Sequence, residues 1–145
     1  MKTILFVCTG NTCRSPMAQA LTEEKLKAAG DGRFCAASAG LFAEGGPAAK
    51  NAVDEMARRG LDLTKHRSTQ LTADMLQNAV RVYTMSAETA ELLKERAPAF
   101  REKIFPLPGS PIPDPYGGDP ETYRRCADRL EESVSALLKE RDAWN

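Results

Sequence analysis

The sequence of 145 residues has no net charge, few cysteines and no long apolar segment. Twenty basic residues balance twenty acidic ones, which argues against a general nucleic-acid binder and against a polybasic membrane protein. No stretch is long enough to cross a bilayer. The apolar run at residues 4–7 is too short for the core of a signal peptide. We therefore expect a cytoplasmic protein that binds neither nucleic acid nor membrane.

The chain also lacks the cysteine pattern of a disulfide framework or of a zinc site. Cys8 and Cys13 lie five residues apart, whereas Cys35 and Cys126 are isolated. Internal repeats, low-complexity tracts and linkers are missing as well. A length of 145 residues suits one hydrophobic core, so we expect a single domain over residues 1–145.

What the chain does contain is an alternation of short apolar segments with amphipathic ones. The apolar segments predict strands at residues 2–7, 33–38, 80–85 and 103–107, and the others predict helices at about 15–30, 47–59, 72–77, 87–96 and 120–141. Such alternation is typical of an α/β fold with a parallel sheet and helices on both faces. Ligands of these folds bind at the carboxyl ends of strands. The loop after the first strand is therefore where a site is expected.

Residues 8–15, Cys-Thr-Gly-Asn-Thr-Cys-Arg-Ser, have the composition of an anion-binding loop. Gly10 permits a turn that a side chain would block, and Asn11 tolerates a left-handed backbone. Ser15 as the N-cap and Pro16 at the first helical position predict that a helix begins here. The free N–H groups at a helix N-terminus attract anions, so this loop predicts a cradle for a tetrahedral oxyanion.

Cys8 and Arg14 supply the chemistry of this cradle. The Arg14 guanidinium can bind two phosphate oxygens at once. Electropositive surroundings favour the thiolate of Cys8, which would attack a bound phosphoryl group. Ser15 is placed to donate a hydrogen bond to the Cys8 sulfur. A buried strand-end cysteine beside an unrelated surface arginine is the alternative, but the spacing between a strand and a proline-initiated helix favours the site.

Two segments together resemble a known family. Residues 7–16 resemble the signature of the low-molecular-weight protein tyrosine phosphatases, and residues 114–119, Asp-Pro-Tyr-Gly-Gly-Asp, resemble that family's second motif. Residues 38–40 and the segment from His66 to Ser68 also fall where the family has related segments. The resemblance covers essentially the whole chain. It implies a Rossmann-like domain with a four-stranded parallel sheet and a two-step reaction that needs no metal or cofactor.

The resemblance also implies roles for individual residues. Cys8 takes the phosphoryl group, Arg14 and the loop amides hold it, and Asp114 acts as general acid and then as general base on water. The residues expected to bind phosphate are Thr9, Gly10, Asn11, Thr12, Cys13, Arg14 and Ser15. Asp114 lies between two prolines, which stiffen its backbone. The rival carboxylate, Asp119, is explained as the N-cap of the last helix.

Further residues are expected around this centre. For His66, the only histidine, a structural role is favoured over direct catalysis, and the resemblance suggests a network of His66, Ser38 and Asn11 that holds the loop. Tyr116 is expected to form a pocket wall, with an ordinary surface aromatic as the alternative. We also hypothesise a reversible disulfide between Cys8 and Cys13 that protects the nucleophile from overoxidation.

Thr12 bears on the substrate. Tyrosine-specific members usually have an aliphatic residue there, and threonine resembles the bacterial protein arginine phosphatase branch. A phosphoarginine guanidinium needs polar partners, which Thr12 and Asp114 can supply. We therefore predict a protein arginine phosphatase. The alternative is a protein tyrosine phosphatase of the same family, in which Thr12 would be a neutral variation. Phosphorylated protein is the expected substrate and inorganic phosphate the product, with a monomeric enzyme.

Two other functions are alternatives to the phosphatase. Thiol-linked arsenate reductases need additional cysteines near the loop, but residues 83–87 contain none, Cys35 falls in a strand and Cys126 on the apolar stripe of a helix. A non-catalytic phosphate-binding module would not need Cys8, Arg14 and Asp114 together. Both alternatives are therefore less favoured than the phosphatase.

Overall fold

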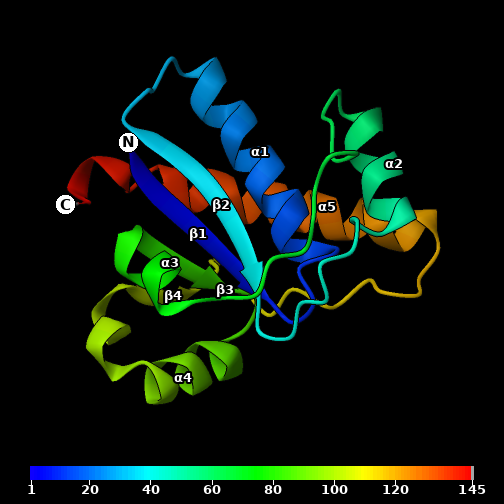
Figure 1. Ribbon diagram of the computed structural model, residues 1–145. Coiled ribbons are helices and arrows are strands. Elements are labelled where there is room, and N and C mark those ends of the chain that lie inside the picture. Colours follow the sequence, from blue (N-terminus) through cyan, green and yellow to red (C-terminus); the bar gives the residue numbers. More distant parts are fainter. Residues whose placement is uncertain (145) are drawn as a thin grey trace.

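The computed structural model describes residues 1–144, with the elements labelled in Figure 1. The strands are β1 (Lys2–Cys8), β2 (Phe34–Gly40), β3 (Ala79–Thr84) and β4 (Ile104–Pro106). The α-helices are α1 (Arg14–Ala28), α2 (Lys50–Arg58), α3 (Ala73–Asn78), α4 (Ala87–Arg96) and α5 (Pro120–Leu138). Short 3-10 helices cover Pro98–Lys103 and Arg141–Ala143. None of the helices within residues 1–144 combines the length and apolar character needed to cross a membrane.

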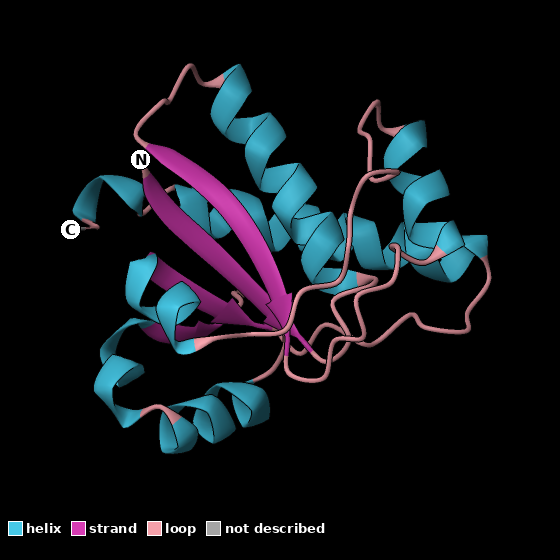
Figure 2. Cartoon of the chain, in the orientation of Figure 1, coloured by secondary structure: helices cyan, strands magenta, loops and turns pink. Residues whose placement is uncertain are grey.

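The four strands form one sheet in the order β2-β1-β3-β4, and every neighbouring pair is parallel. The expected α/β fold with a four-stranded parallel sheet is therefore confirmed. Because the strands are parallel, their carboxyl ends share one edge, and the loops drawn in pink gather beside that edge in Figure 2. In the register of the first pair, Cys8 lies opposite Gly40 at this edge.

Helices cover both faces of the sheet, as the alternation predicts. Alternate residues of β1 face opposite layers, as the pleat of a strand requires. Ile4 and Phe6 belong to a core with α1, α2 and α5, whereas Leu5 and Val7 belong to a second core with α3 and α4 (Figure 1). All four side chains are at most 1% exposed. The central strand is thus buried on both sides, and its carboxyl end has a rigid base.

The apolar stripe on which Cys126 was expected is confirmed in α5. Its members are all buried: Tyr123, Cys126, Leu130, Val134 and Leu137. Asp119 is the N-cap of this helix and accepts a hydrogen bond from the Thr122 N–H at 2.9 Å. The interpretation of Asp119 as a cap is therefore confirmed.

Two helix starts differ from the prediction. The first helix begins at Arg14 with Cys13 as its N-cap, so Ser15 is not the cap. The Ser15 hydroxyl is instead directed to the Cys8 sulfur, a contact that sequence rules for caps do not consider. The second helix begins at Lys50 rather than near residue 47, because Pro47 forms an isolated bridge with Arg67.

Candidate active site

A pocket of about 330 Å³ lies at the carboxyl edge of the sheet. Its wall combines the 8–15 loop with three later segments, and the lining residues are Cys8, Thr9, Gly10, Thr12, Cys13, Arg14, Phe42, Glu44, Gly46, Ser68, Asp114 and Tyr116. The structure therefore brings Cys8, Arg14 and Asp114 to one cavity, although Asp114 is a hundred residues away in the sequence.

Cys8 lies at the base of the loop, and the residue is 5% exposed. The Asn11 backbone N–H donates to the Cys8 sulfur at 3.3 Å, and the Ser15 Oγ lies 2.8 Å from it. The Asn11 side-chain amide donates to the same Ser15 Oγ at 2.7 Å. Since Ser15 accepts that hydrogen bond, its own hydroxyl proton remains for the sulfur. Two hydrogen-bond donors therefore point at the Cys8 sulfur from within the loop.

Asn11 stabilises the conformation of the 8–15 loop through its backbone and its side chain. Its backbone has φ 56°, the left-handed region that the sequence led us to expect at this residue. The Asn11 Oδ1 accepts from the Thr69 N–H at 2.9 Å, which defines the orientation of the side-chain amide. His66 Nε2 lies 2.8 Å from the Asn11 carbonyl oxygen. A carbonyl only accepts, so Nε2 carries the proton and donates.

Ser38 takes a different partner from the one expected. Its hydroxyl donates to the Gln19 Oε1 at 2.7 Å, which links β2 to α1. His66 and Asn11 are thus in direct contact, while Ser38 supports the neighbouring strand and helix. The hydrogen bond to Asn11 that completes the network comes from Thr69, which the sequence analysis did not identify.

Gly40 allows the 8–15 loop to approach the end of β2. A Cβ at this position would lie 2.8 Å from the Thr9 carbonyl oxygen and 3.0 Å from the Asn11 nitrogen. Both are backbone atoms of the loop, so no side-chain rotation would relieve the clash. Gly40 is therefore required by a close contact between backbones.

Arg14 connects the loop to the segment that holds Asp114. Its Nη1 donates to the Ile112 carbonyl oxygen at 3.0 Å, and its Nη2 lies 3.8 Å from the Asp114 Oδ2. The Arg14 side chain is 13% exposed, against 53% for that of Asp114. The cation is consequently held within the wall, and the carboxylate stands at the open side of the pocket.

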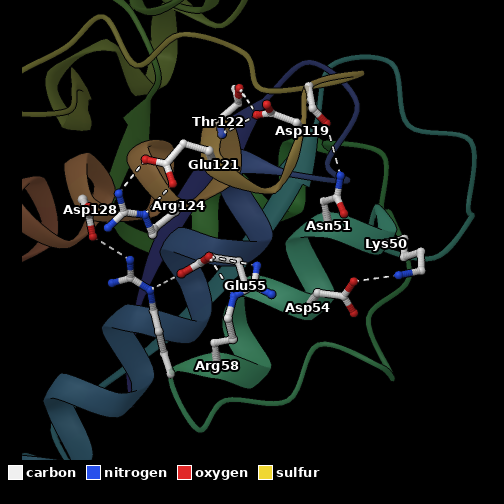
Figure 3. Close-up of polar contacts among 12 residues, drawn as sticks. Lys50, Asn51, Asp54, Glu55, Arg58, Asp119, Glu121, Thr122, Arg124 and Asp128 are labelled. Carbon is white, nitrogen blue, oxygen red and sulfur yellow. Dashed lines mark hydrogen bonds and ion pairs between the residues drawn. The ribbon is translucent and has the colours of Figure 1, made fainter.

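The 113–119 loop is anchored at several points around Asp114. The Asp114 Oδ1 accepts from the Tyr116 N–H at 3.0 Å, which forms a local turn. Further along, the Asn51 side-chain amide donates to the Gly118 carbonyl oxygen at 3.1 Å (Figure 3). Asn51 is in the first turn of α2, so this helix braces the loop that presents the carboxylate.

An ion-pair network holds α2 against α5 in the same view (Figure 3). Glu55 is 3% exposed, and its carboxylate accepts from Arg58 and from Arg59. Arg59 also contacts Asp128 at 2.6 Å and Glu131 at 2.8 Å, both on α5. Arg59 therefore links the buried Glu55 carboxylate of α2 to two carboxylates of α5. These contacts give α2, the helix that carries Asn51, a defined position against α5.

Cys13 lines the pocket but has a neighbour of its own. Its sulfur lies 3.3 Å from the Tyr123 hydroxyl oxygen on α5. Burial raises the pKa of the Cys13 thiol, and burial also raises that of Cys126 to about 12. Cys35 pairs in register with Thr3 near the amino end of β2, away from the pocket. The surroundings of Cys13 and Cys126 thus favour thiols at neutral pH.

Three wall residues stand out at the mouth. Tyr116 is 75% exposed, and it lines the pocket as expected from the sequence. Phe42 is 68% exposed and Glu44 is also exposed; neither was identified from the sequence. Phe42 reaches the pocket because its N–H donates to the Thr9 carbonyl at 2.9 Å, which continues β2 beside the loop. No pattern in the sequence predicts this contact between Phe42 and the loop.

A parallel sheet with a thiol inside an arginine-flanked anion loop at the end of its first strand defines a class of cysteine-based phosphatases. Residues 3–143 match the family described as low molecular weight phosphotyrosine protein phosphatase. The chain belongs to this family, and it is a protein phosphatase. The resemblance seen in the sequence is thereby confirmed.

Relatives with both substrate names are similar to the chain. A protein-arginine-phosphatase of Geobacillus stearothermophilus is 38% identical, over 94% of this chain and 93% of its own length. A probable low molecular weight protein-tyrosine-phosphatase of Ralstonia nicotianae, EpsP, is 36% identical over 99% and 94%. A solved structure of the arginine phosphatase YwlE, a mutant with a phosphorylated active-site serine in place of cysteine, is 34% identical over 95% and 94%, with a TM-score of 0.88.

Proposed function

We propose that the protein hydrolyses phosphorylated protein side chains through a cysteinyl-phosphate on Cys8, and that phosphoarginine is the preferred substrate. The observation that carries this proposal is the pair of hydrogen bonds to the Cys8 sulfur from Asn11 and Ser15. These hydrogen bonds hold the buried sulfur at the base of the anion loop, in a position suited to attack on a bound phosphoryl group. The YwlE mutant with a phosphorylated active-site serine supports a phosphoenzyme in this family.

In the first step, the Cys8 sulfur attacks phosphorus as the bond to the leaving group breaks. The loop N–H groups and the Arg14 guanidinium stabilise the charge on the three equatorial oxygens. Asp114, at the open side of the pocket, gives its proton to the leaving group. The products are the dephosphorylated side chain and a phosphocysteine.

In the second step, water attacks the phosphocysteine and the Cys8 sulfur leaves. Asp114, now ionised, takes a proton from the water, which regenerates its acid form. The Ser15 hydroxyl proton remains available to the departing sulfur, because Asn11 donates to the Ser15 oxygen. Inorganic phosphate then leaves the loop.

Thr12 is the basis for preferring phosphoarginine. It lines the pocket together with Asp114, so a hydroxyl and a carboxylate are available to a guanidinium. The Geobacillus relative, described as an arginine phosphatase, agrees with this choice. The alternative is phosphotyrosine, which is favoured by the flat faces of Phe42 and Tyr116 at the mouth and by the Ralstonia relative.

The test is turnover of matched phosphoarginine and phosphotyrosine peptides by the wild type and two variants. Cys8→Ser should abolish phosphate release from both, and release that survives would overturn the mechanism. Thr12→Ile should lower kcat/KM on phosphoarginine relative to phosphotyrosine. An unchanged or increased preference for arginine in that variant would remove Thr12 as the specificity residue.

We also propose that Cys8 and Cys13 form a reversible disulfide after oxidation of Cys8. Peroxide oxidises Cys8 to a sulfenic acid and is itself reduced to water. The Cys13 thiol then attacks the Cys8 sulfur, the S–O bond breaks, and the thiol proton leaves with the hydroxyl group as water to give the disulfide. Loss of two hydrogens should appear in the mass of the peroxide-treated protein, and a thiol should restore its activity. Irreversible inactivation without that mass change would refute the disulfide. The expected cytoplasmic location and monomeric state stay predictions.

A further inference from the structure

Glu44 lies at the mouth of the pocket and has no role in the reaction described above. It belongs to the connection between β2 and α2, two residues after Phe42, and its side chain lines the cavity that contains Cys8. The residue is exposed to solvent. A group that contacts Glu44 therefore approaches from outside the anion loop.

The backbone on both sides of Glu44 is held in place. The Ala43 N–H donates to the Gln70 side-chain oxygen at 2.9 Å, and the Gly45 N–H donates to the Ser68 hydroxyl at 2.8 Å. Both acceptors come from the segment that follows His66, which itself supports the 8–15 loop. The carboxylate is thus presented from an anchored turn, which gives its charge a defined location.

The charge of Glu44 is uncompensated around the pocket. Among the lining residues, Arg14 is the cation, and its guanidinium is directed to Ile112 and Asp114. Within residues 1–144, the Glu44 carboxylate makes no hydrogen bond or ion pair. A carboxylate near a phosphate-binding loop repels a substrate that brings only negative charge, unless the substrate also places a cation beside it.

We propose that Glu44 selects substrate proteins with a lysine or arginine next to the phosphorylated residue. The inference rests on the proposed function, because it assumes a phosphoryl group on the side chain that enters the 8–15 loop. That group occupies the base of the pocket, so the exposed mouth is met by the neighbouring residues of the substrate. A basic neighbour pairs with Glu44, whereas an acidic neighbour is repelled by it.

The test uses phosphopeptides that differ only in the residues flanking the phosphorylated one: lysine, glutamine or glutamate. The wild type should turn over the lysine-flanked peptide about two- to fivefold faster in kcat/KM than the glutamine-flanked one, as expected for an exposed ion pair. High salt should reduce this ratio because it screens exposed charges. Glu44→Gln should abolish the ratio, and Glu44→Lys should favour the glutamate-flanked peptide.

Glu102→Gln is the matched control. Glu102 is another exposed glutamate, but it precedes β4 at the opposite edge of the sheet, so this variant should keep the wild-type ratio. Equal kcat/KM for all flanking residues, or a ratio that survives Glu44→Gln, would overturn the inference while leaving the phosphatase activity intact.

Phosphoarginine and phosphotyrosine versions of each peptide separate a neighbouring cation from the guanidinium of phosphoarginine itself. If Glu44→Gln lowers only the arginine-to-tyrosine ratio, whatever the flanking residue, Glu44 contacts that guanidinium and the proposal is wrong. If no peptide is turned over, or if release survives Cys8→Ser, the proposed function fails and the inference fails with it.

Discussion

Replacing Asn51 by alanine should impair proton donation by Asp114 without impairing the attack of Cys8. The Asn51 amide donates to the Gly118 carbonyl at 3.1 Å, and this bond ties the 113–119 loop to α2. The 8–15 loop does not depend on it. The Ala49 N–H, next to the start of α2, donates to the Thr12 carbonyl oxygen at 2.9 Å. A side-chain change at Asn51 leaves this backbone hydrogen bond in place.

The size of the effect follows from one partly buried hydrogen bond. Such a bond contributes about 0.5–1.5 kcal/mol to the preferred loop position, which corresponds to about a 2- to 12-fold change in its population at 1.4 kcal/mol per factor of ten. The whole contribution of a general acid is about 10²–10⁴-fold. The variant should therefore lose a small part of the acid's contribution rather than all of it.

Aryl phosphates with good and poor leaving groups provide the assay, because only a poor leaving group needs a proton as its bond breaks. We expect kcat/KM of Asn51→Ala to fall about 2- to 12-fold on phenyl phosphate and less than twofold on p-nitrophenyl phosphate. Lys50→Ala is the control, since the neighbouring Lys50 is paired, among residues 1–144, only with Asp54 on the same helix (Figure 3). Equal losses on both substrates, or none, would refute the bracing of Asp114 by Asn51.

Two further predictions concern the loop and the stability of the fold. Gly40→Ala should lower kcat about 10- to 100-fold in a folded protein, because its Cβ would displace the Thr9 carbonyl and with it the loop; unchanged kcat with a native circular dichroism spectrum would contradict this. Hydrogen bonds from Arg33, and to a smaller extent from Arg141, hold the pKa of Asp31 well below its usual range. Since the pKa is lower in the folded state, these bonds stabilise the fold above about pH 4 and are lost as the pH falls further. Asp31→Asn should therefore lower Tm at pH 7 and approach the wild type in acid; a Tm difference independent of pH would contradict the pairing.

The order of elements was predictable because it depends on local patterns. The apolar segments became strands, the stripe of α5 is buried, and Asp119 caps that helix. Helix starts near the loop were less predictable, since they respond to contacts from elsewhere in the chain. Pro47 pairs with Arg67 instead of starting α2, and Cys13 rather than Ser15 caps α1.

The candidate site was also predictable only in part. Cys8, Arg14 and Ser15 are neighbours in the sequence, so a single motif indicated their shared role. Asp114 depended on a second motif, recognised through the resemblance to the family. Glu44 belongs to no motif; it joins the pocket because its turn is anchored by side chains more than twenty residues away.

The sequence by itself determined a cysteine–arginine anion loop between a strand and a helix, because that cradle is built from consecutive residues and their backbone preferences. Tertiary structure alone decided which groups complete it. The Ser15 proton is aimed at the Cys8 sulfur only because Asn11 occupies the serine oxygen, and Asn11 is oriented by Thr69. The contact between Asn11 and Thr69 joins segments whose separation in sequence carries no periodic or local signal, so only the folded chain brings them together.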